Sequence, residues 1–164
     1  MIDKPKPRAL VTGASRGIGA AIAKELGSMG HPLILNYRSN REAAEAVRSE
    51  IESSGGEGSL CGFDVRDRAA ASAAIDRLLA EDERPIGILV NNAGVVADSA
   101  FPAMTWEAWE EVTRTTLDGF FNVTHPLVMP MVRQRWGRII SLSSISGLRG
   151  NRGQVNYAAA KAGI

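Results

Sequence analysis

The chain has 164 residues, of which 45% are hydrophobic and 23% are charged, a balance that excludes a disordered or fibrous protein. Its 19 basic and 18 acidic residues leave a net charge of +1, so no broad field is available to hold nucleic acid or an anionic membrane. The single Cys61 excludes an internal disulfide, and no apolar run reaches the roughly 20 residues that span a bilayer. No export signal is visible, so we expect a cytoplasmic location.

Short apolar runs alternate along the chain with longer segments of helical period. The runs predict strands at 8–12, 32–37, 59–63, 86–91 and 138–142. The longer segments predict helices at 17–29, 41–54, 67–81 and 106–133. This alternation predicts an α/β fold, a Rossmann-type doubly wound parallel sheet with helices on both faces. Such sheets bind ligands beyond the carboxyl ends of their strands.

A glycine-rich turn follows the first predicted strand. Three glycines within eight residues allow a tight turn and close approach of a pyrophosphate to the amino end of the next helix. An ordinary strand-to-helix connection is the alternative, but the position between an apolar strand and an amphipathic helix favours a dinucleotide site. The candidate contacts are Gly13, Ser15, Arg16, Gly17, Ile18 and Gly19.

The end of the second predicted strand indicates which dinucleotide is bound. A carboxylate there would accept hydrogen bonds from the adenosine ribose of NAD, but the strand runs into Arg38 and Ser39. Arg38 and Arg16 can instead converge on a 2′-phosphate, because a guanidinium matches phosphate oxygens in a bidentate fork. The alternative is that both arginines are solvated loop residues. The pattern favours NADPH as the cofactor.

Further motifs follow in a fixed order: Asp64-Val65, then 91–94 (Asn-Asn-Ala-Gly), Ser144, and 157–161 (Tyr-Ala-Ala-Ala-Lys). With the glycine-rich turn they resemble the short-chain dehydrogenase/reductase family along the whole chain. Within that family, 136–140 and 150–157 are most similar to β-ketoacyl-acyl-carrier-protein reductases. The resemblance implies NADPH-dependent reduction of a 3-oxoacyl thioester, carried by acyl carrier protein, to the 3-hydroxyacyl product in fatty acid biosynthesis.

The resemblance also assigns cofactor contacts after the third and fourth predicted strands. It implies that Asp64 and Val65 hold the adenine ring, the carboxylate through the exocyclic amine. Asn91 is expected to stabilise the sheet edge beside the cofactor. Ala93 and Gly94 are expected to leave room for the ribose, because small residues allow close backbone approach.

Tyr157 and Lys161 are four residues apart, so on a helix they share one face and can both contact the nicotinamide ribose of the cofactor. Alone, this spacing is equally typical of a surface pair. Reduction of a carbonyl needs a general acid, and a phenol is too weak an acid unless an adjacent cation strengthens it. Ser144 is expected to hydrogen-bond the substrate oxygen where negative charge develops. Composition also admits 141, 143 and 146 as the serine, but the family spacing selects Ser144.

One residue departs from the family pattern. Thr116 stands where the family has an asparagine that positions a water relaying protons to the lysine. Either the threonine hydroxyl holds the same water or the relay is weakened, and the nearby Asp118 and Asn122 are out of register. Arg135 matches a family arginine that contacts the acidic carrier protein, and an exposed arginine in a basic loop is the alternative.

The remaining expectations concern metals, domains and assembly. His31 and His125 are isolated from each other and from cysteine, so we expect no metal site. We expect 1–164 to form a single dinucleotide-binding domain that is truncated at its carboxyl end, leaving the fifth strand as an exposed edge. The resemblance implies a homotetramer. Alternative functions are a related reductase acting on acetoacetyl-CoA, a sugar or a steroid, and a non-catalytic nucleotide-binding fragment.

Overall fold

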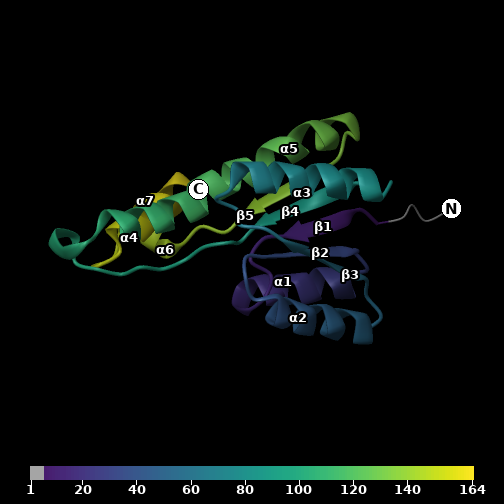
Figure 1. Ribbon diagram of the computed structural model, residues 1–164, viewed down its shortest axis with the longest axis horizontal. Helices are drawn as coiled ribbons and strands as arrows, with labels where there is room; N and C mark the ends of the chain where they lie inside the picture. The colour runs from purple at the N-terminus through teal and green to yellow at the C-terminus, as the bar shows by residue number, and fades with distance from the viewer. Residues whose placement is uncertain (1–5) are drawn as a thin grey trace.

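The computed structural model describes residues 6–164. A five-stranded sheet forms its centre, and all neighbouring strands are parallel, in the order β3-β2-β1-β4-β5 (Figure 1). The strands are β1 (Arg8–Val11), β2 (Leu33–Tyr37), β3 (Gly58–Gly62), β4 (Ile86–Asn91) and β5 (Arg138–Ser141). All five lie within one residue of the predicted bounds, and the predicted parallel sheet is confirmed.

Helices cover both faces of the sheet (Figure 1). The first face carries α1 (Gly17–Ser28) and α2 (Arg41–Ser53), and the second carries α3 (Arg68–Glu81) and α5 (Gly119–Arg133). Successive strand residues point to opposite faces, so two cores form. Ala9 and Val11 pack in the core beneath α1 and α2, whereas Leu10 packs with residues of α3 and α5. The predicted doubly wound arrangement is therefore confirmed.

The segment predicted as one helix over 106–133 is interrupted. It consists of α4 (Trp106–Thr113), a π-helical turn η2 (Arg114–Asp118) and α5. The helix lies close to the loop after β3 where the interruption ends, because a Cβ added to Gly119 would lie 2.8 Å from Val65 Cγ2. Single π-helical turns within α-helices occur frequently at functional sites. The hydrophobic pattern of the sequence does not reveal such a turn, because the apolar stripe continues on both sides of it.

Short elements complete the chain. The 3-10 turn η1 (Phe101–Ala103) and α6 (Ile145–Arg149) were not predicted, because elements this short contain too little periodic pattern. The helix α7 (Val155–Gly163) carries Tyr157 and Lys161, as predicted. β5 lies at the edge of the sheet, with Ile139 and Ile140 43% and 48% exposed. Across residues 6–164, no helix combines the length and apolar composition needed to cross a membrane.

Arg135 adopts a left-handed backbone conformation, with φ at 56°, directly after α5. Its N–H donates to Val132 O and the Trp136 N–H donates to Met131 O, a helix ending that usually employs glycine. We expect Arg135→Gly to raise the free energy of unfolding by about 0.5 to 1 kcal/mol, measured by urea unfolding. The matched control is Gln134→Gly, where φ is −79°, which should lower it by a similar amount. A less stable Arg135→Gly variant would show that the left-handed conformation of Arg135 does not strain the backbone.

Candidate active site

A groove of about 540 Å³ opens at the carboxyl ends of the strands. It lies where β1 is flanked by β2 on one side and β4 on the other, the point at which the order of strands reverses direction. Every predicted cofactor contact except Asn91, Tyr157 and Lys161 lines it. These residues are Gly13, Ser15, Arg16, Gly17, Ile18, Gly19, Arg38, Ser39, Asp64, Val65, Ala93 and Gly94.

The glycine-rich turn needs its glycines for two different reasons. Gly13 and Gly17 have φ values of 63° and 56°, a region that side chains other than glycine rarely adopt. A Cβ added to Gly19 would lie 2.4 Å from Gly13 O, so the turn is too tight for a larger residue there. A Cβ at Gly17 meets no atom within 4 Å, because this glycine faces the open groove.

Two polar residues that the sequence analysis did not single out join the turn to β4. The Thr12 hydroxyl accepts hydrogen bonds from the backbone N–H groups of Asn92 and Ala93, both at 3.0 Å. The Asn92 amide donates to Thr12 O at 2.8 Å and to Gly13 O at 3.1 Å. These bonds fix the floor of the groove. The Asn-Asn doublet was the available signal, although it is equally typical of a simple turn.

The end of the groove near β2 and β3 is rich in charge. Arg16 and Arg38 both line it, as predicted, and Arg38 forms an ion pair with Glu111 of α4. Asp64 accepts hydrogen bonds from the Arg66 guanidinium at 2.7 to 3.1 Å. These bonds hold the pKa of the Asp64 carboxyl below its ordinary value. The adenine contact expected of Asp64 would therefore be made by a carboxylate that is already bound to an arginine.

Tyr157 and Lys161 lie together on α7, and neither is among the residues that line the groove. The Lys161 ammonium is 5.7 Å from the centre of the Tyr157 ring and donates to Leu142 O at 2.6 Å. A Cβ added to Gly94 would lie 3.8 Å from Lys161 Nζ, which places the ammonium next to the groove wall. The side chain is buried, and burial lowers the pKa of Lys161. The structure thus brings the predicted acid and its cation to the same place.

A buried amide anchors the helix that carries this pair. Asn156 is 0% exposed, and its amide donates to Ala97 O at 3.0 Å and Ala108 O at 3.1 Å. Its own Oδ1 accepts from the Tyr157 N–H at 2.8 Å. The start of α7 is thereby fixed against α4 and the segment after β4. No local sequence signal indicates this role, because both acceptors are distant in the chain.

Hydrogen bonds distinguish the four candidate serines. The hydroxyls of Ser143 and Ser146 donate to Lys161 O and to Gln154 Oε1, and Ser141 accepts from the Asn91 amide. Ser144 caps the amino end of α6, and its Oγ accepts from the Ser146 N–H at 3.2 Å. Among residues 6–164, nothing accepts the Ser144 hydroxyl proton. That hydroxyl can still donate to a ligand.

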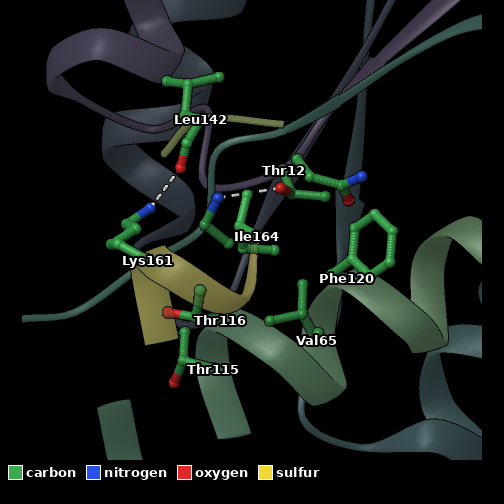
Figure 2. Close-up of a pocket in the computed structure, with 11 residues that line it drawn as sticks. Thr12, Val65, Thr115, Thr116, Phe120, Leu142, Lys161 and Ile164 are labelled. Atoms are coloured by element: carbon green, nitrogen blue, oxygen red, sulfur yellow. Dashed lines mark hydrogen bonds between the residues drawn. The ribbon is translucent and has the colours of Figure 1, made fainter. Parts of the chain in front are cut away.

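Thr116 borders a second, much smaller cavity of about 10 Å³ (Figure 2). This is close to the smallest space that accommodates one water molecule. The cavity is lined by Lys161, Thr116 and Asn91 among others, so Asn91 lies behind the groove rather than in its wall. The Thr116 hydroxyl oxygen is buried and has no hydrogen-bond partner within the described residues. A buried hydroxyl in that state costs free energy unless something else bonds to it.

The buried ammonium gives the protein a pH-dependent stability. Because the folded-state pKa of Lys161 lies below its ordinary value of 10.5, the folded state binds fewer protons than the unfolded state between those two values. The contribution of Lys161 to stability is therefore lowest below this window and rises with pH through it. We expect the free energy of unfolding of the unsubstituted protein, minus that of Lys161→Met, to increase from pH 7 to about pH 10. A decrease of this difference with pH, measured by urea unfolding, would contradict a lowered pKa of the buried Lys161.

Three other predicted residues lie apart from the groove. Arg135 is exposed in the turn before β5, near the amino ends of the strands and so at the opposite end of the sheet from their carboxyl ends. His31 Nδ1 lies 2.9 Å from Pro7 O, and the His125 ring stacks on Phe121 with centroids 5.1 Å apart. Within residues 6–164, no group of three or more His, Cys, Asp or Glu side chains could hold a metal ion.

The chain was compared with known proteins. It is 50% identical over 159 residues to a 3-oxoacyl-[acyl-carrier-protein] reductase of Aggregatibacter actinomycetemcomitans, a match that covers 94% of this chain and 64% of the relative. It is 48% identical over 155 residues to an acetoacetyl-CoA reductase of Rhizobium meliloti, covering 94% and 62%. The chain thus spans less than two thirds of the length of these relatives.

A solved structure has the same arrangement. It is a 3-oxoacyl (acyl-carrier-protein) reductase of Agrobacterium tumefaciens with NADP bound, which matches with a TM-score of 0.88 and 34% identity. The match covers 97% of this chain and 61% of that one. The family model described as short chain dehydrogenase matches residues 7–164. The chain therefore belongs to the short-chain dehydrogenase family.

Proposed function

We propose that the protein reduces 3-oxoacyl thioesters on acyl carrier protein to 3-hydroxyacyl thioesters, with NADPH as the reductant. The observation that carries this proposal is the placement of Lys161. Its buried ammonium lies beside the Tyr157 ring and next to the wall of the groove. The residues proposed as the proton donor and its neighbouring cation therefore lie next to the groove at the carboxyl ends of the strands.

The groove fits a phosphorylated dinucleotide. Gly17 faces open space at the amino end of α1, where backbone N–H groups and the helix dipole favour a pyrophosphate. Arg16, Arg38 and Ser39 line the same groove and would hold a 2′-phosphate. When bound, the cofactor supplies a hydride from its nicotinamide to the substrate carbonyl carbon.

The chain's own residues would handle the carbonyl oxygen. The Ser144 hydroxyl donates a hydrogen bond to that oxygen, and the Tyr157 phenol gives it a proton as negative charge develops. The Lys161 ammonium favours the phenolate that remains, because opposite charges attract strongly in a buried site. A water in the cavity beside Thr116 would return a proton towards Lys161, with the threonine hydroxyl as its anchor.

A second substrate form has specific support. A relative at 48% identity is an acetoacetyl-CoA reductase, so the same 3-oxoacyl group on coenzyme A is the alternative to the carrier-bound one. Both would use the same carbonyl chemistry. The sequence predicts that Arg135 contacts the carrier, but Arg135 lies at the amino ends of the strands, at the opposite end of the sheet from Ser144 and Tyr157. A carrier contact at Arg135 on the same chain would thus lie far from the carbonyl.

Self-association has its own support. Phe121, Met129 and Val132 of α5 are 48%, 54% and 59% exposed, which is an unusual exposure of apolar surface for a helix. We propose that these side chains contact other copies of the chain in a homotetramer. Light scattering would measure the mass in solution, and a monomer at micromolar concentration would contradict this part of the proposal.

The cofactor choice predicts a preference that binding alone can test. We expect NADPH to bind about tenfold to a hundredfold more tightly than NADH, because a charged bidentate contact contributes about 1.5 to 3 kcal/mol. Calorimetric titration of both cofactors measures the ratio. In the Arg38→Leu variant the ratio should fall towards one while NADH affinity is kept. Equal affinities in the unsubstituted protein would contradict the assignment of NADPH.

A further inference from the structure

A carboxylate that the cofactor assignment does not use lies beside the charged end of the groove. Glu111 lies on α4, and its Oε1 is 3.7 Å from Arg38 Nη1. The same residue accepts the Thr115 hydroxyl proton at its backbone oxygen, at 2.6 Å, and Thr115 lines the groove one turn further along. Glu111 is therefore held beside the groove by the helix that forms part of its wall.

Two of the guanidinium groups near this end, those of Arg38 and Arg66, are paired with carboxylates, and they differ in how firmly they are bound. Arg66 forms a close, bidentate pair with Asp64, with contacts of 2.7 to 3.1 Å. The contact of Arg38 with Glu111 is longer than a normal hydrogen bond, and the two side chains are 50% and 44% exposed. Exposed pairs of this kind are weak and exchange readily. Arg38 is thus the guanidinium that a ligand phosphate can take over.

We propose that Glu111 sets the strength of the preference for a 2′-phosphate, because its carboxylate and that phosphate compete for Arg38. This inference rests on the proposed use of NADPH. Binding of the phosphate removes the partner of Glu111 and brings a like charge close to it. NADH has a hydroxyl at that position, so its binding leaves the ion pair in place. Glu111 would thus lower the affinity for NADPH and leave the affinity for NADH unaltered.

The test compares Glu111→Gln with a matched control on the same helix. Glu107→Gln removes the same charge one turn earlier, from an exposed residue that forms no ion pair with Arg38 within residues 6–164. Calorimetric titration with NADPH and NADH requires no turnover. We expect Glu111→Gln to bind NADPH about threefold to tenfold more tightly, and NADH within about twofold of the unsubstituted protein. Glu107→Gln should change neither affinity by more than about twofold.

An Arg38→Leu background completes the test. Without the guanidinium, Glu111→Gln should alter NADPH affinity by less than about threefold, because only the repulsion is left. Unchanged NADPH affinity in Glu111→Gln, or an equal gain for NADH, would overturn the inference. Equal binding of both cofactors by the unsubstituted protein would instead contradict the assignment of NADPH. The two failures are therefore distinguishable.

Discussion

The Tyr157→Phe variant will lose turnover by about a hundredfold to ten-thousandfold, because a positioned general acid contributes that much to carbonyl reduction. The substitution removes one oxygen and keeps the ring beside Lys161. The anchoring of α7 also remains, since Asn156 bonds to the Tyr157 backbone N–H rather than to its side chain. The measurement is the rate of NADPH consumption at saturating cofactor and thioester.

The same preparation provides the control for this variant. NADPH affinity of Tyr157→Phe should stay within about threefold of the unsubstituted protein, because Tyr157 is not among the residues that line the groove. Turnover that survives the substitution would show that another group protonates the carbonyl oxygen. Loss of both turnover and cofactor affinity would indicate a disturbed fold instead of a lost acid.

The Thr116→Val variant is expected to slow turnover by about tenfold to a hundredfold, less than loss of the acid itself because the relay is one water removed from the carbonyl. Valine matches the shape of threonine and removes only the hydroxyl. That hydroxyl is buried, borders a cavity of about 10 Å³ shared with Lys161, and has no partner among residues 6–164. A water bound there would be lost with it.

Two further variants separate the possible results for Thr116. Thr113→Val makes the same change on α4, where the hydroxyl donates to Trp109 O, and should leave turnover unaltered. Thr116→Asn restores the residue type that the family has at this position. Unchanged turnover in Thr116→Val would refute the threonine-anchored relay. A faster Thr116→Asn variant would then show that the relay is already impaired in this chain.

The sheet and its long helical segments could be predicted because each is marked locally by its apolar pattern. Alternating apolar runs place the five strands, and the glycine-rich turn fixes where the groove opens. The interruption at η2 could not be predicted, because one additional residue in a helical turn leaves the apolar pattern almost unaltered. Thr116 lies in that turn, so its buried hydroxyl, which has no hydrogen-bond partner within residues 6–164, could not be predicted either.

Contacts between residues that are distant in the sequence could not be predicted either. Spacing indicated that Tyr157 and Lys161 share a helix face, and motif position indicated that Arg38 lies near a phosphate. The ion pair of Arg38 with Glu111 joins residues 73 positions apart. The Asn156 contacts with Ala97 and Ala108 are also long-range. Such pairs follow from how the helices pack on the sheet, which one sequence does not specify residue by residue.

The most direct test of the proposed function is NADPH consumption in the presence of a 3-oxoacyl thioester. Purified protein is mixed with NADPH and either a carrier-bound or a coenzyme A-bound acetoacetyl group, and loss of the reduced nicotinamide absorbance is followed. We expect one 3-hydroxyacyl thioester to form for each NADPH consumed, and slower consumption of NADH at the same concentration. NADPH that binds tightly but is not consumed with either thioester would contradict the account and indicate a non-catalytic nucleotide-binding protein.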